Sequence, residues 1–483
     1  MRSPHPEQWR QRNQQKKAAG RRLLTLTASN RHTLTAHWLD PQDGSVHAES
    51  LSHAGTFPSL TPVLPEVAWD EREIHDLFGD VPEDHPDLRP LVRTPRWPQA
   101  FHPLARSQTS PPNWHDVEPD NPAKLVAGEG ITVMKVGPTH AGVIESGHFV
   151  FSLIGENVLH LDLHLFQNHR GIEALLEQRP VAAVAPLVTR ICAADTVSHQ
   201  TNWALAIEAM AGYQSAEELR WRRVILLEAE RVLSHLNDLA QIPAGVGFQV
   251  AQQRALAMKE TWQRGLKALF GHRLLFDTVG PGWAQKPSID GIFILIDNLR
   301  QAFKPWRALV QSHHGFMDRM HAVGVVRQAS AERLGAEGVA ARAAGTSFDA
   351  RTTMPLYQGL SIVPVVQRGG DVQARFLVRL DELEASLRII EESATRLRRS
   401  PTADPPWVLP HDLTGHVVTY TESPHGLNVH DVEIQAGRTA RYHVRPATYR
   451  NWPLLAHAVA GNAVADFPLI NKSFELCYSC TDR

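Results

Sequence analysis

Cysteine is scarce in this sequence, with only three among 483 residues. Three cysteines cannot form the disulfide framework of a small secreted domain, and an odd number in a long chain is typical of a protein kept in a reducing compartment. Cys192 stands alone in the middle of the sequence, whereas Cys477 and Cys480 lie together near its end. All thiol chemistry is therefore confined to two short stretches.

Long apolar runs and an excess of one charge are also missing. No stretch approaches the roughly 20 apolar residues of a membrane-spanning helix, and too few apolar residues follow Arg21 and Arg22 to form a signal-peptide core. A formal net charge of -2 provides no basic field for nucleic acid. The sequence therefore predicts a globular protein that is not exported, does not bind nucleic acid and reaches a membrane only through partner subunits.

Histidine, in contrast, is abundant, with 26 residues. An imidazole carries protons near neutral pH and binds transition metals, so this number weakly favours proton or metal chemistry. Ordinary surface histidines would explain the same number. Composition alone leaves both interpretations open.

The patterns along the chain predict an α+β fold with two folded domains. The first shows the alternation of short strands up to about residue 60, followed by an acidic amphipathic helix at residues 69–78 that ends at Gly79. A connector rich in Pro, Ser and Asp separates it from a mostly helical remainder. The predicted organisation is a disordered basic N-terminus, a small α/β domain, a linker and a mainly helical domain with a small β-sheet, at residues 1–22, 23–95, 96–128 and 129–483.

Several elements of the larger domain can be placed. Alternating residues at 147–166, around a turn at Gly155, predict two paired strands. Ser215 and Glu218 have the spacing of a capping box at the start of a helix. Long helices are predicted at residues 215–242, 289–320 and 372–400, and further strands at residues 415–426 and 438–449.

The spacing of the thiols suggests a metal site. Cys477 and Cys480 are three residues apart, so a single turn places both sulfur atoms on one side, and Cys192 and Asp195 repeat this spacing. If the two turns meet, three thiolates and one carboxylate form a four-donor set for a transition metal. A redox dithiol, a structural zinc site completed by His199, and small buried cysteines explain the same spacing.

Six stretches in a fixed order carry a family resemblance. "GPTHAGVIESGHF", "HRGIE", "RIC…SH", "RVILLEAERVLSHL" and "CYSCTDR" together resemble the large subunit of membrane-bound nickel–iron hydrogenases of the formate hydrogenlyase type, and are equally similar to the D subunit of respiratory complex I. "WDEREIHDLFG…HPDLRPLV" is similar to the C subunit of complex I. The resemblance covers nearly everything from about residue 60 onward. It implies a first domain like the C subunit, fused to a second domain that is like the hydrogenase large subunit and the D subunit.

The resemblance implies a metal centre and a proton acceptor. In the hydrogenase family two Cys-x-x-Cys turns hold nickel and iron, so Cys192 and Cys477 would be terminal nickel ligands and Cys480 a bridging one. Asp195 takes the remaining bridging position. Glu173 matches the family's proton gate beside a terminal thiolate, where a carboxyl suits proton relay. Without the motif, Glu173 would be interpreted as an ordinary acid at a helix start.

Three residues depart from the hydrogenase pattern. A carboxylate at Asp195 replaces a thiolate, and carboxylate is a harder ligand. His425 stands where the family has an arginine, so a permanent charge is replaced by a group that gains and loses a proton. Glu475 and Leu476 replace the Asp-Pro pair before the cysteine. We predict catalytic roles for Glu173, His425 and Glu475 in a site with altered hydrogen chemistry.

The complex I side of the resemblance implies a quinone-like loop. His140 matches the loop near which quinone binds in the D subunit of complex I, and His148 lies close to it. The position of the family's tyrosine is taken by Gln167, whose amide donates a proton far less readily than a phenol. We expect His140 and His148 to serve a proton path, with two structural loop histidines as the alternative.

Charged residues are expected to support this site. Opposite charges three and four residues apart share helix faces, and their match to charged positions of the related subunits favours buried pairs. The long helices contribute Glu228, Glu230, Arg231, His235, Asp371, Arg375, Arg379 and Glu382, and the predicted supporting shell consists of Arg190, His199, Arg342, Asp349 and Arg351.

The sequence therefore predicts a redox subunit of a membrane-bound hydrogenase-like or NADH-quinone oxidoreductase-like complex, peripheral on the cytoplasmic side of the inner membrane. Three cysteines cannot hold both this site and an iron–sulfur cluster, which is expected in a small partner subunit. A ferredoxin-like subunit, membrane-arm subunits and, in the formate hydrogenlyase type, a formate dehydrogenase complete the expected partners. Family members are usually cleaved after the residue that matches Arg483, which suggests a mature form or a chain without that tail. A metal-free structural and coupling subunit is the alternative function.

Overall fold

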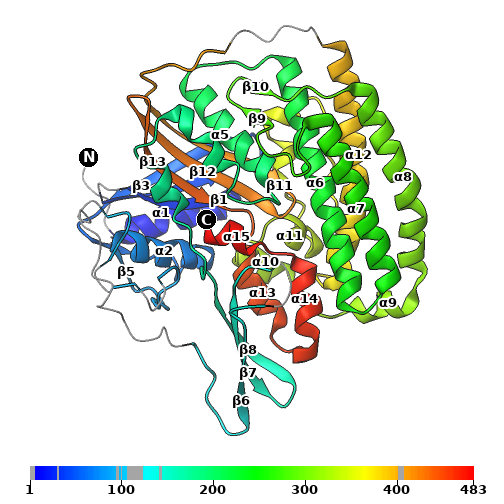
Figure 1. The fold of residues 1–483 in the computed structure, drawn as a ribbon. Coiled ribbons are helices and arrows are strands. Elements are labelled where there is room, and N and C mark those ends of the chain that lie inside the picture. The colour runs from blue at the N-terminus through cyan, green and yellow to red at the C-terminus, as the bar shows by residue number, and fades with distance from the viewer. Residues whose placement is uncertain are drawn as a thin grey trace.

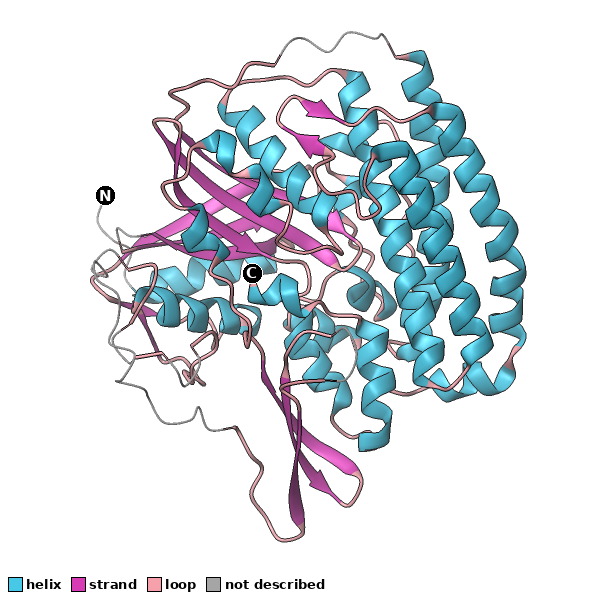
Figure 2. Ribbon diagram, viewed as in Figure 1, coloured by secondary structure: helices cyan, strands magenta, loops and turns pink. Residues whose placement is uncertain are grey.

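The computed structural model describes residues 6–29, 32–93, 97–98, 101–105, 123–140, 144–400 and 407–483. Strands and short helices occupy one part of the molecule, and long helices stand side by side in the other (Figures 1 and 2). The predicted α+β class is confirmed. No described helix combines the length and the apolar character that crossing a membrane requires. The predicted linker at residues 96–128 lies largely outside the described residues.

The N-terminal domain combines a three-stranded antiparallel sheet with two helices. Strands β1, β2 and β3 pair in that order, β4 and β5 form a parallel pair, and α2 packs against β1. Gly79 ends α2 in a left-handed conformation with a φ of 81°, as predicted. The elements are α1 (Pro6–Ala18), β1 (Arg22–Ser29), β2 (Thr33–Leu39), β3 (Val46–Ser52), β4 (Thr56–Pro58), α2 (Ala68–Phe78) and β5 (Val81–Glu83).

Helix α1 corrects the prediction of a disordered N-terminus. Trp9 is completely buried in the core of this domain, and Asn13 accepts a hydrogen bond of 2.9 Å from the indole of Trp38. Basic residues of the same helix pair with carboxylates of this domain, for example Lys17 with Glu66 at 2.5 Å. A single large apolar side chain therefore anchors a segment whose composition is otherwise polar.

Four long helices form the core of the second domain. They are α6 (Glu217–Gly245), α7 (Gln249–Phe270), α8 (Ile289–Ser312) and α12 (Val372–Arg399), and each packs against the next around the bundle (Figure 1). Helix α12 confirms the helix predicted at residues 372–400. Asp371 caps its N-terminus by accepting a 2.7 Å hydrogen bond from the amide of Ala374.

Two predicted helix boundaries were wrong. Helix α6 begins at Glu217 with Ala216 before it and no side-chain cap. Glu218 pairs with Arg222 and Lys286. The helix predicted at residues 289–320 is interrupted, and α9 (His314–Met320) is separate from α8. His313 occupies the break, where its Nδ1 accepts a 3.0 Å hydrogen bond from the amide of Phe316.

Two further sheets complete the second domain. Strands β6, β7 and β8 form an antiparallel sheet that extends away from the body (Figure 1), and β7 and β8 confirm the paired strands predicted around Gly155. Strands β11, β12 and β13 form a sheet between the N-terminal domain and α5 (Thr196–Met210), and β12 was not predicted. These strands are β6 (Ile131–Val136), β7 (His148–Ile154), β8 (Asn157–His164), β11 (Gly415–Ser423), β12 (Gly426–Gln435) and β13 (Arg438–Arg445).

Short elements connect these parts. They are α3 (Ile172–Leu176), α4 (Ala185–Val188), α5 (Thr196–Met210), β9 (Val279–Gly280), β10 (Trp283–Ala284), α10 (Gln328–Arg333), α11 (Gly338–Ala343), α13 (Asn451–Val459), α14 (Phe467–Phe474) and α15 (Tyr478–Asp482). Helices α5 and α15 matter most for the thiols, because each begins directly at one of the two cysteine-containing stretches.

A buried carboxylate links the two domains. Asp431 on β12 lies 3.2 Å from Nε2 of His37 on β2 and also accepts a hydrogen bond from His416 on β11. The hydrogen bond with Asp431 raises the pKa of His416 above its ordinary value, against the opposing effect of burial. Protonation of His416 therefore stabilises the folded chain relative to the unfolded chain.

Asp431→Asn is expected to lower the free energy of unfolding by about 1 to 3 kcal/mol at about pH 6, because it removes an acceptor of charge-assisted hydrogen bonds. His416 has a raised folded pKa, so its contribution is complete below its unfolded pKa of about 6.5 and is lost as the pH rises through the folded value. The destabilisation should therefore be smaller at about pH 9. Denaturant titration of both proteins measures it, and a loss independent of pH would contradict this assignment.

Candidate metal centre

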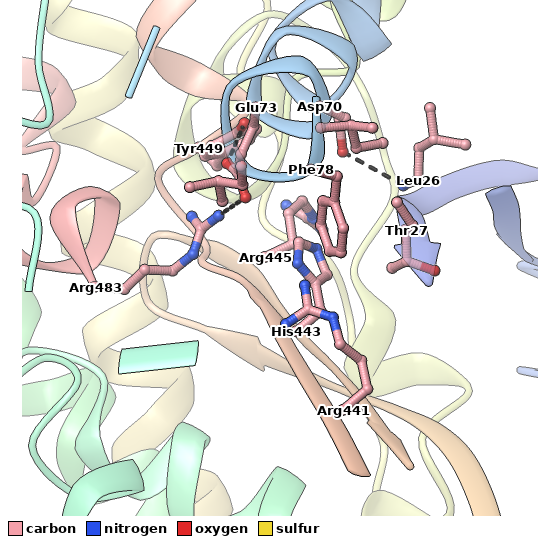
Figure 3. Close-up of a pocket in the computed structure, with 13 residues that line it drawn as sticks. Leu26, Thr27, Asp70, Glu73, Phe78, Arg441, His443, Arg445, Tyr449 and Arg483 are labelled. Atoms are coloured by element: carbon pink, nitrogen blue, oxygen red, sulfur yellow. Dashed lines mark hydrogen bonds and ion pairs between the residues drawn. The ribbon is translucent and has the colours of Figure 1, made fainter. Parts of the chain in front are cut away.

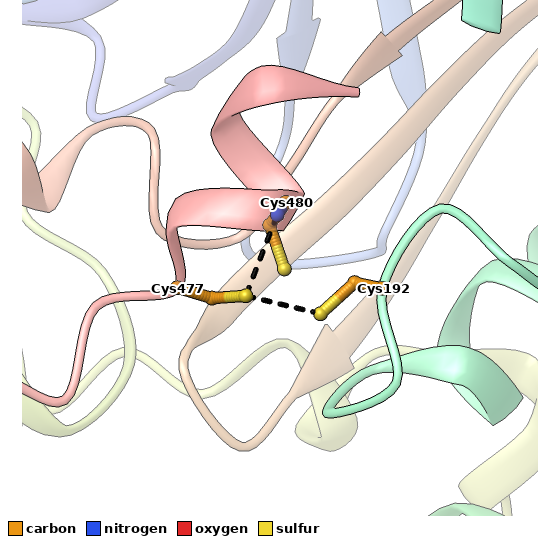
Figure 4. A group of neighbouring side chains, drawn as sticks. All are labelled: Cys192, Cys477 and Cys480. Atoms are coloured by element: carbon orange, nitrogen blue, oxygen red, sulfur yellow. Dashed lines mark hydrogen bonds between the residues drawn. The ribbon is translucent and has the colours of Figure 1, made fainter. Parts of the chain in front are cut away.

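The two cysteine-containing stretches meet. The Sγ atoms of Cys192 and Cys477 are 3.2 Å apart, and all three sulfur atoms lie within 4.8 Å of one another (Figure 4). Asp195 joins them, with its Oδ2 3.6 Å from Sγ of Cys480. Cys192, Cys480 and Asp195 are buried. The four predicted donors are therefore gathered in one place.

Local hydrogen bonds fix each stretch. Cys477 is the N-cap of α15, where its sulfur accepts a 3.4 Å hydrogen bond from the amide of Cys480. The indole of Trp452 donates to the hydroxyl of Thr481 at 2.9 Å. Arg170 connects the two stretches by donating to the carbonyls of Ile191 and Ser479, at 2.6 and 2.7 Å. Sequence reasoning missed Arg170, although it is the arginine of the "HRGIE" stretch.

The three thiols differ in pKa. Hydrogen bonds from Cys192 and then Cys480 lower the pKa of Cys477 well below its ordinary value. The hydrogen bond that Cys192 gives to Cys477 raises the pKa of Cys192 well above its ordinary value. Cys477 is therefore the first of the three to ionise, and a thiolate is the form that binds metal.

His425 contacts Asp195 at the carboxylate oxygen that does not face Cys480. Its Nδ1 lies 3.2 Å from Oδ1 of Asp195. Burial lowers the pKa of His425, but the charge of Asp195 and the hydrogen bond between them outweigh burial and raise it to about 9. His425 is therefore protonated at neutral pH. One carboxylate oxygen of Asp195 faces this imidazolium and the other faces Cys480.

Two acidic residues, Asp238 and Glu475, lie near His425. Its Nε2 is 3.8 Å from Oδ2 of Asp238 on α6, a residue that sequence reasoning missed although it follows His235 by three positions. Asp238 also accepts a 2.8 Å hydrogen bond from Arg379. Glu475, in a left-handed conformation at the end of α14, belongs to the same group. Burial and then the charge of Asp238 raise the pKa of Glu475 to about 8, so it holds a proton at neutral pH.

Glu173 lies between two arginines and a histidine. It pairs with Arg441, His443 and Arg483, at 2.7, 3.0 and 3.3 Å. Burial would raise the pKa of Glu173, but these charges, Arg441 first, hold it well below its ordinary value. A proton gate must gain and lose a proton, and these partners keep Glu173 ionised. The geometry therefore supports an anchoring role for Glu173.

The same cluster joins the two domains. Figure 3 shows Arg483 reaching Glu73 of α2, beside Arg441 and His443 of β13. Glu73 also accepts a 2.8 Å hydrogen bond from the hydroxyl of Tyr449. The residue that follows α15 is thus tied to the N-terminal domain.

Most of the predicted supporting shell is buried and paired. Arg342 donates to Glu382 and Glu422, at 2.6 and 2.8 Å, and Arg351 pairs with Asp349 and Glu228, at 2.7 and 3.1 Å. All of these side chains are buried. The predicted burial of charged pairs between the helices agrees with the structure.

Two residues of the predicted supporting shell differ from the prediction: Arg190 lies away from the thiols, and His199 pairs with another histidine. Arg190 is about half exposed and pairs with Asp277, so it does not face the thiols. His199 is completely buried and its Nδ1 lies 2.9 Å from Nε2 of His430, whose Nδ1 is 2.7 Å from the hydroxyl of Tyr442. No partner for Nε2 of His199 exists among the described residues.

The predicted quinone-like loop borders the cysteine-containing turn. Nε2 of His140 lies 2.7 Å from the carbonyl oxygen of Gly147, and its ring is 6.4 Å from that of Tyr478, which follows Cys477 directly. The ring of His148 lies 5.6 Å from that of His164. Gln167 is exposed and donates weakly to the carbonyl of His164 at 3.4 Å. Of these three residues, only His140 therefore lies against the turn that holds Cys477.

Family models match both domains. The model of the 49 kDa subunit of respiratory-chain NADH dehydrogenase matches residues 246–412, and that of the 30 kDa subunit matches residues 12–111. The first domain is therefore similar to the 30 kDa subunit, and the second to the 49 kDa subunit.

Curated relatives and a solved structure agree with this division. Formate hydrogenlyase subunit 5 of Escherichia coli (strain K12) is 29% identical, covering 91% of this chain and 79% of its own. Hydrogenase-4 component G of the same organism is 30% identical, covering 88% and 76%. The C/D 2 subunit of the NADH-quinone oxidoreductase of Aquifex aeolicus (strain VF5) is 24% identical, covering 91% and 86%.

A chain of the membrane-bound sulfane sulfur reductase, an archaeal respiratory membrane complex, superimposes with a TM-score of 0.67 at 25% identity, covering 74% of this chain and 99% of that one. The likeness therefore extends from sequence to fold. The chain is an oxidoreductase subunit, and it belongs to the family that unites the large subunits of membrane-bound hydrogenases with the fused 30 and 49 kDa subunits of respiratory-chain NADH dehydrogenase.

Proposed function

We propose that this chain carries a divergent nickel–iron-type centre, held by Cys192, Asp195, Cys477 and Cys480, that couples electron transfer to proton movement in a membrane-bound complex. The observation that carries the proposal is the convergence of the only three cysteines of the sequence. They lie in two stretches 285 residues apart, and no structural need would confine thiols to such a place.

The donor set suits a thiophilic metal. Cys192 and Cys477 would hold nickel, and Cys480 and Asp195 would complete the donor set for nickel and iron. Because the Cys477 thiol ionises first, one soft ligand is available without removal of a proton by an external base. The carboxylate is a harder donor than the thiolate it replaces. When bound, such a centre supplies redox chemistry that the side chains themselves cannot.

The proton side of the proposal rests on His425, Asp238 and Glu475. The imidazolium of His425 contacts Asp195 through Nδ1 and approaches Asp238 through Nε2. Glu475, with its raised pKa, is a second proton holder of the same group. His425 and Glu475 hold protons near the thiols, whereas its ion pairs with Arg441 and Arg483 keep Glu173 ionised.

The names of the relatives support a set of partners. Formate hydrogenlyase, hydrogenase-4 and NADH-quinone oxidoreductase are the systems to which the related subunits belong. We infer a small iron–sulfur subunit as the electron partner, a ferredoxin-like subunit, membrane-arm subunits and, if the complex is of the formate hydrogenlyase type, a formate dehydrogenase. The chain would then be peripheral on the cytoplasmic side of the inner membrane.

A metal-free structural and coupling subunit is the second candidate. The ion pair between His425 and Asp195 favours it, because a carboxylate that already faces an imidazolium needs no metal to balance its charge. The buried ion pairs that join α6, α11 and α12 would then transmit movement between domains.

Metal analysis of the purified intact complex separates the two candidates, combined with infrared spectroscopy for carbonyl and cyanide bound to iron. We expect one nickel per chain and the infrared bands of iron-bound carbonyl and cyanide in the native complex, and the loss of both from a Cys192→Ser complex of unchanged subunit composition. The iron of the iron–sulfur subunits is present in either complex, so nickel and the bands are the readout. Nickel or zinc without these infrared bands would replace the nickel–iron assignment by a simpler metal site. Absence of nickel, of zinc and of the infrared bands from an assembled complex would leave only the coupling function.

Asp195→Cys tests how far the carboxylate alters the chemistry. A thiolate there restores the soft bridging ligand, so hydrogen uptake by the complex is expected to rise by at least about tenfold, which corresponds to about 1.4 kcal/mol of barrier. Asp195→Asn is the matched control, since it removes the charge without supplying sulfur. Equal activities of the two variants would show that the carboxylate is not what limits hydrogen chemistry.

A further inference from the structure

Three loops at one edge of the N-terminal domain bring His32, His53 and Asp80 together. His32 lies in the turn between β1 and β2, His53 follows β3, and Asp80 follows the end of α2. One ligand atom from each lies within 4.8 Å of the others. We propose that these residues form a binding site for a divalent transition metal of the zinc class, separate from the thiols.

The backbone holds the three loops in place. The amide of His53 donates to the carbonyl of His32 at 2.9 Å, and the amide of Val81 donates to the carbonyl of Gly55 at 2.9 Å. The first bond joins the two histidine loops, and the second joins the loop of His53 to the residue after Asp80. The ligand side chains are therefore brought together before any ion binds, which reduces the entropic cost of binding.

The distances between donor atoms suit a small tetrahedral ion. Nδ1 of His32 is 3.0 Å from one carboxylate oxygen of Asp80, and Nε2 of His53 is 3.7 Å from the other. Zinc bonds of about 2.0 to 2.1 Å at tetrahedral angles separate two donor atoms by about 3.4 Å. The observed distances lie on either side of this value, so small side-chain rotations would complete the site.

Burial and charge also point to a cation. The side chain of His53 is only 3% exposed, and its Nε2 makes no hydrogen bond to any described residue. A buried polar atom without a partner is costly, and a metal ion would satisfy it. The side chain of His32 is 58% exposed, so an ion can enter from solvent. Two imidazoles and one carboxylate favour zinc over magnesium or calcium, which prefer oxygen ligands.

One rearrangement must accompany binding. Nδ1 of His53 accepts a 3.2 Å hydrogen bond from the amide of Gly55, so in the metal-free chain the ring proton sits on Nε2. Binding of metal at Nε2 moves this proton to Nδ1 and breaks the bond to Gly55. Gly55 has a φ of 101°, and its amide is left without this acceptor when the metal binds. Faster hydrogen exchange of the Gly55 amide is therefore a signature of occupancy.

Calorimetric titration of zinc into the full chain with Cys192→Ser, Cys477→Ser and Cys480→Ser tests the proposal. We expect one ion to bind per chain, and His32→Ala to weaken binding by at least about 100-fold, more than the loss of an outer partner of a ligand costs. His321→Ala is the matched control, because His321 is an exposed histidine 3.7 Å from Asp371 in the other domain. No binding, or binding equally strong after His32→Ala, would overturn the proposal.

Cobalt(II) spectra of the chain with its cysteines intact give the same answer if the serine variant does not fold. Cobalt at the thiols produces sulfur-to-cobalt charge-transfer absorption, whereas cobalt at histidine and carboxylate produces only ligand-field bands. His32→Ala should remove the ligand-field bands of one bound ion and leave the charge-transfer absorption unchanged. Identical spectra with and without His32 would exclude the site, whatever metal the thiols bind.

Discussion

Glu382→Ala is expected to lower the free energy of unfolding by about 3 to 5 kcal/mol, because it removes one carboxylate partner from buried cations. Glu382 is completely buried on α12, where it accepts hydrogen bonds from Arg342 and His235, at 2.6 and 2.8 Å. Burial would raise the pKa of Glu382, but the charge of Arg342 and the hydrogen bond with His235 hold it well below its ordinary value. Chemical denaturation of the full chain measures the loss.

Glu384→Ala provides the matched control. Glu384 lies on the same helix, is about 40% exposed and is 3.5 Å from Arg307. Surface ion pairs of this kind contribute about 0 to 1 kcal/mol. If both alanine variants were destabilised equally, the large loss would come from α12 itself and not from the charges that it buries.

Cys477→Ser is expected to abolish tight binding of nickel or cobalt at the thiols. Both other cysteines donate to this sulfur, and its thiolate is the one that forms without a metal. A hydroxyl at the same place is a poor ligand for these ions, so the affinity should fall by more than about 100-fold, a loss of about 2.7 kcal/mol. The sulfur-to-cobalt charge-transfer absorption of the full chain measures the affinity.

Ser479→Ala is the control for this variant. Ser479 belongs to the same turn, and its hydroxyl lies 3.5 Å from Sγ of Cys477, but the donor set does not include it. Its removal should leave the absorption in place. Retention of the charge-transfer absorption after Cys477→Ser would show that the remaining thiols suffice and that Cys477 is not the principal ligand.

Local patterns predicted the elements whose formation depends on local sequence. The periodicity of α12 and the glycine that ends α2 are visible in a few consecutive residues, and both elements form where expected. Helix α1 was missed because one tryptophan, Trp9, fixes a segment that is otherwise polar. The break at His313 was missed because the apolar periodicity continues across it. In both cases a single contact outweighs the average composition.

The donors of the candidate metal centre could be named from spacing and family resemblance, but their surroundings could not. Asp238 and Arg170 act through partners that are distant in sequence, such as His425 and Ser479, and no spacing rule connects them. Glu173 illustrates the same limit. Its motif suggests proton transfer, whereas its environment is set by β13 and Arg483, which no local pattern places beside it.

The long separation of the two cysteine-containing stretches has a consequence for biogenesis. During translation Cys192 leaves the ribosome hundreds of residues before Cys477, and closing so long a loop requires much of the intervening chain to have folded. An unfinished polypeptide therefore exposes a lone thiol and one acid instead of a complete ligand set. If the thiols hold a metal, as proposed, its delivery must wait until the second stretch has been made, so insertion of the ion reports that both stretches have met.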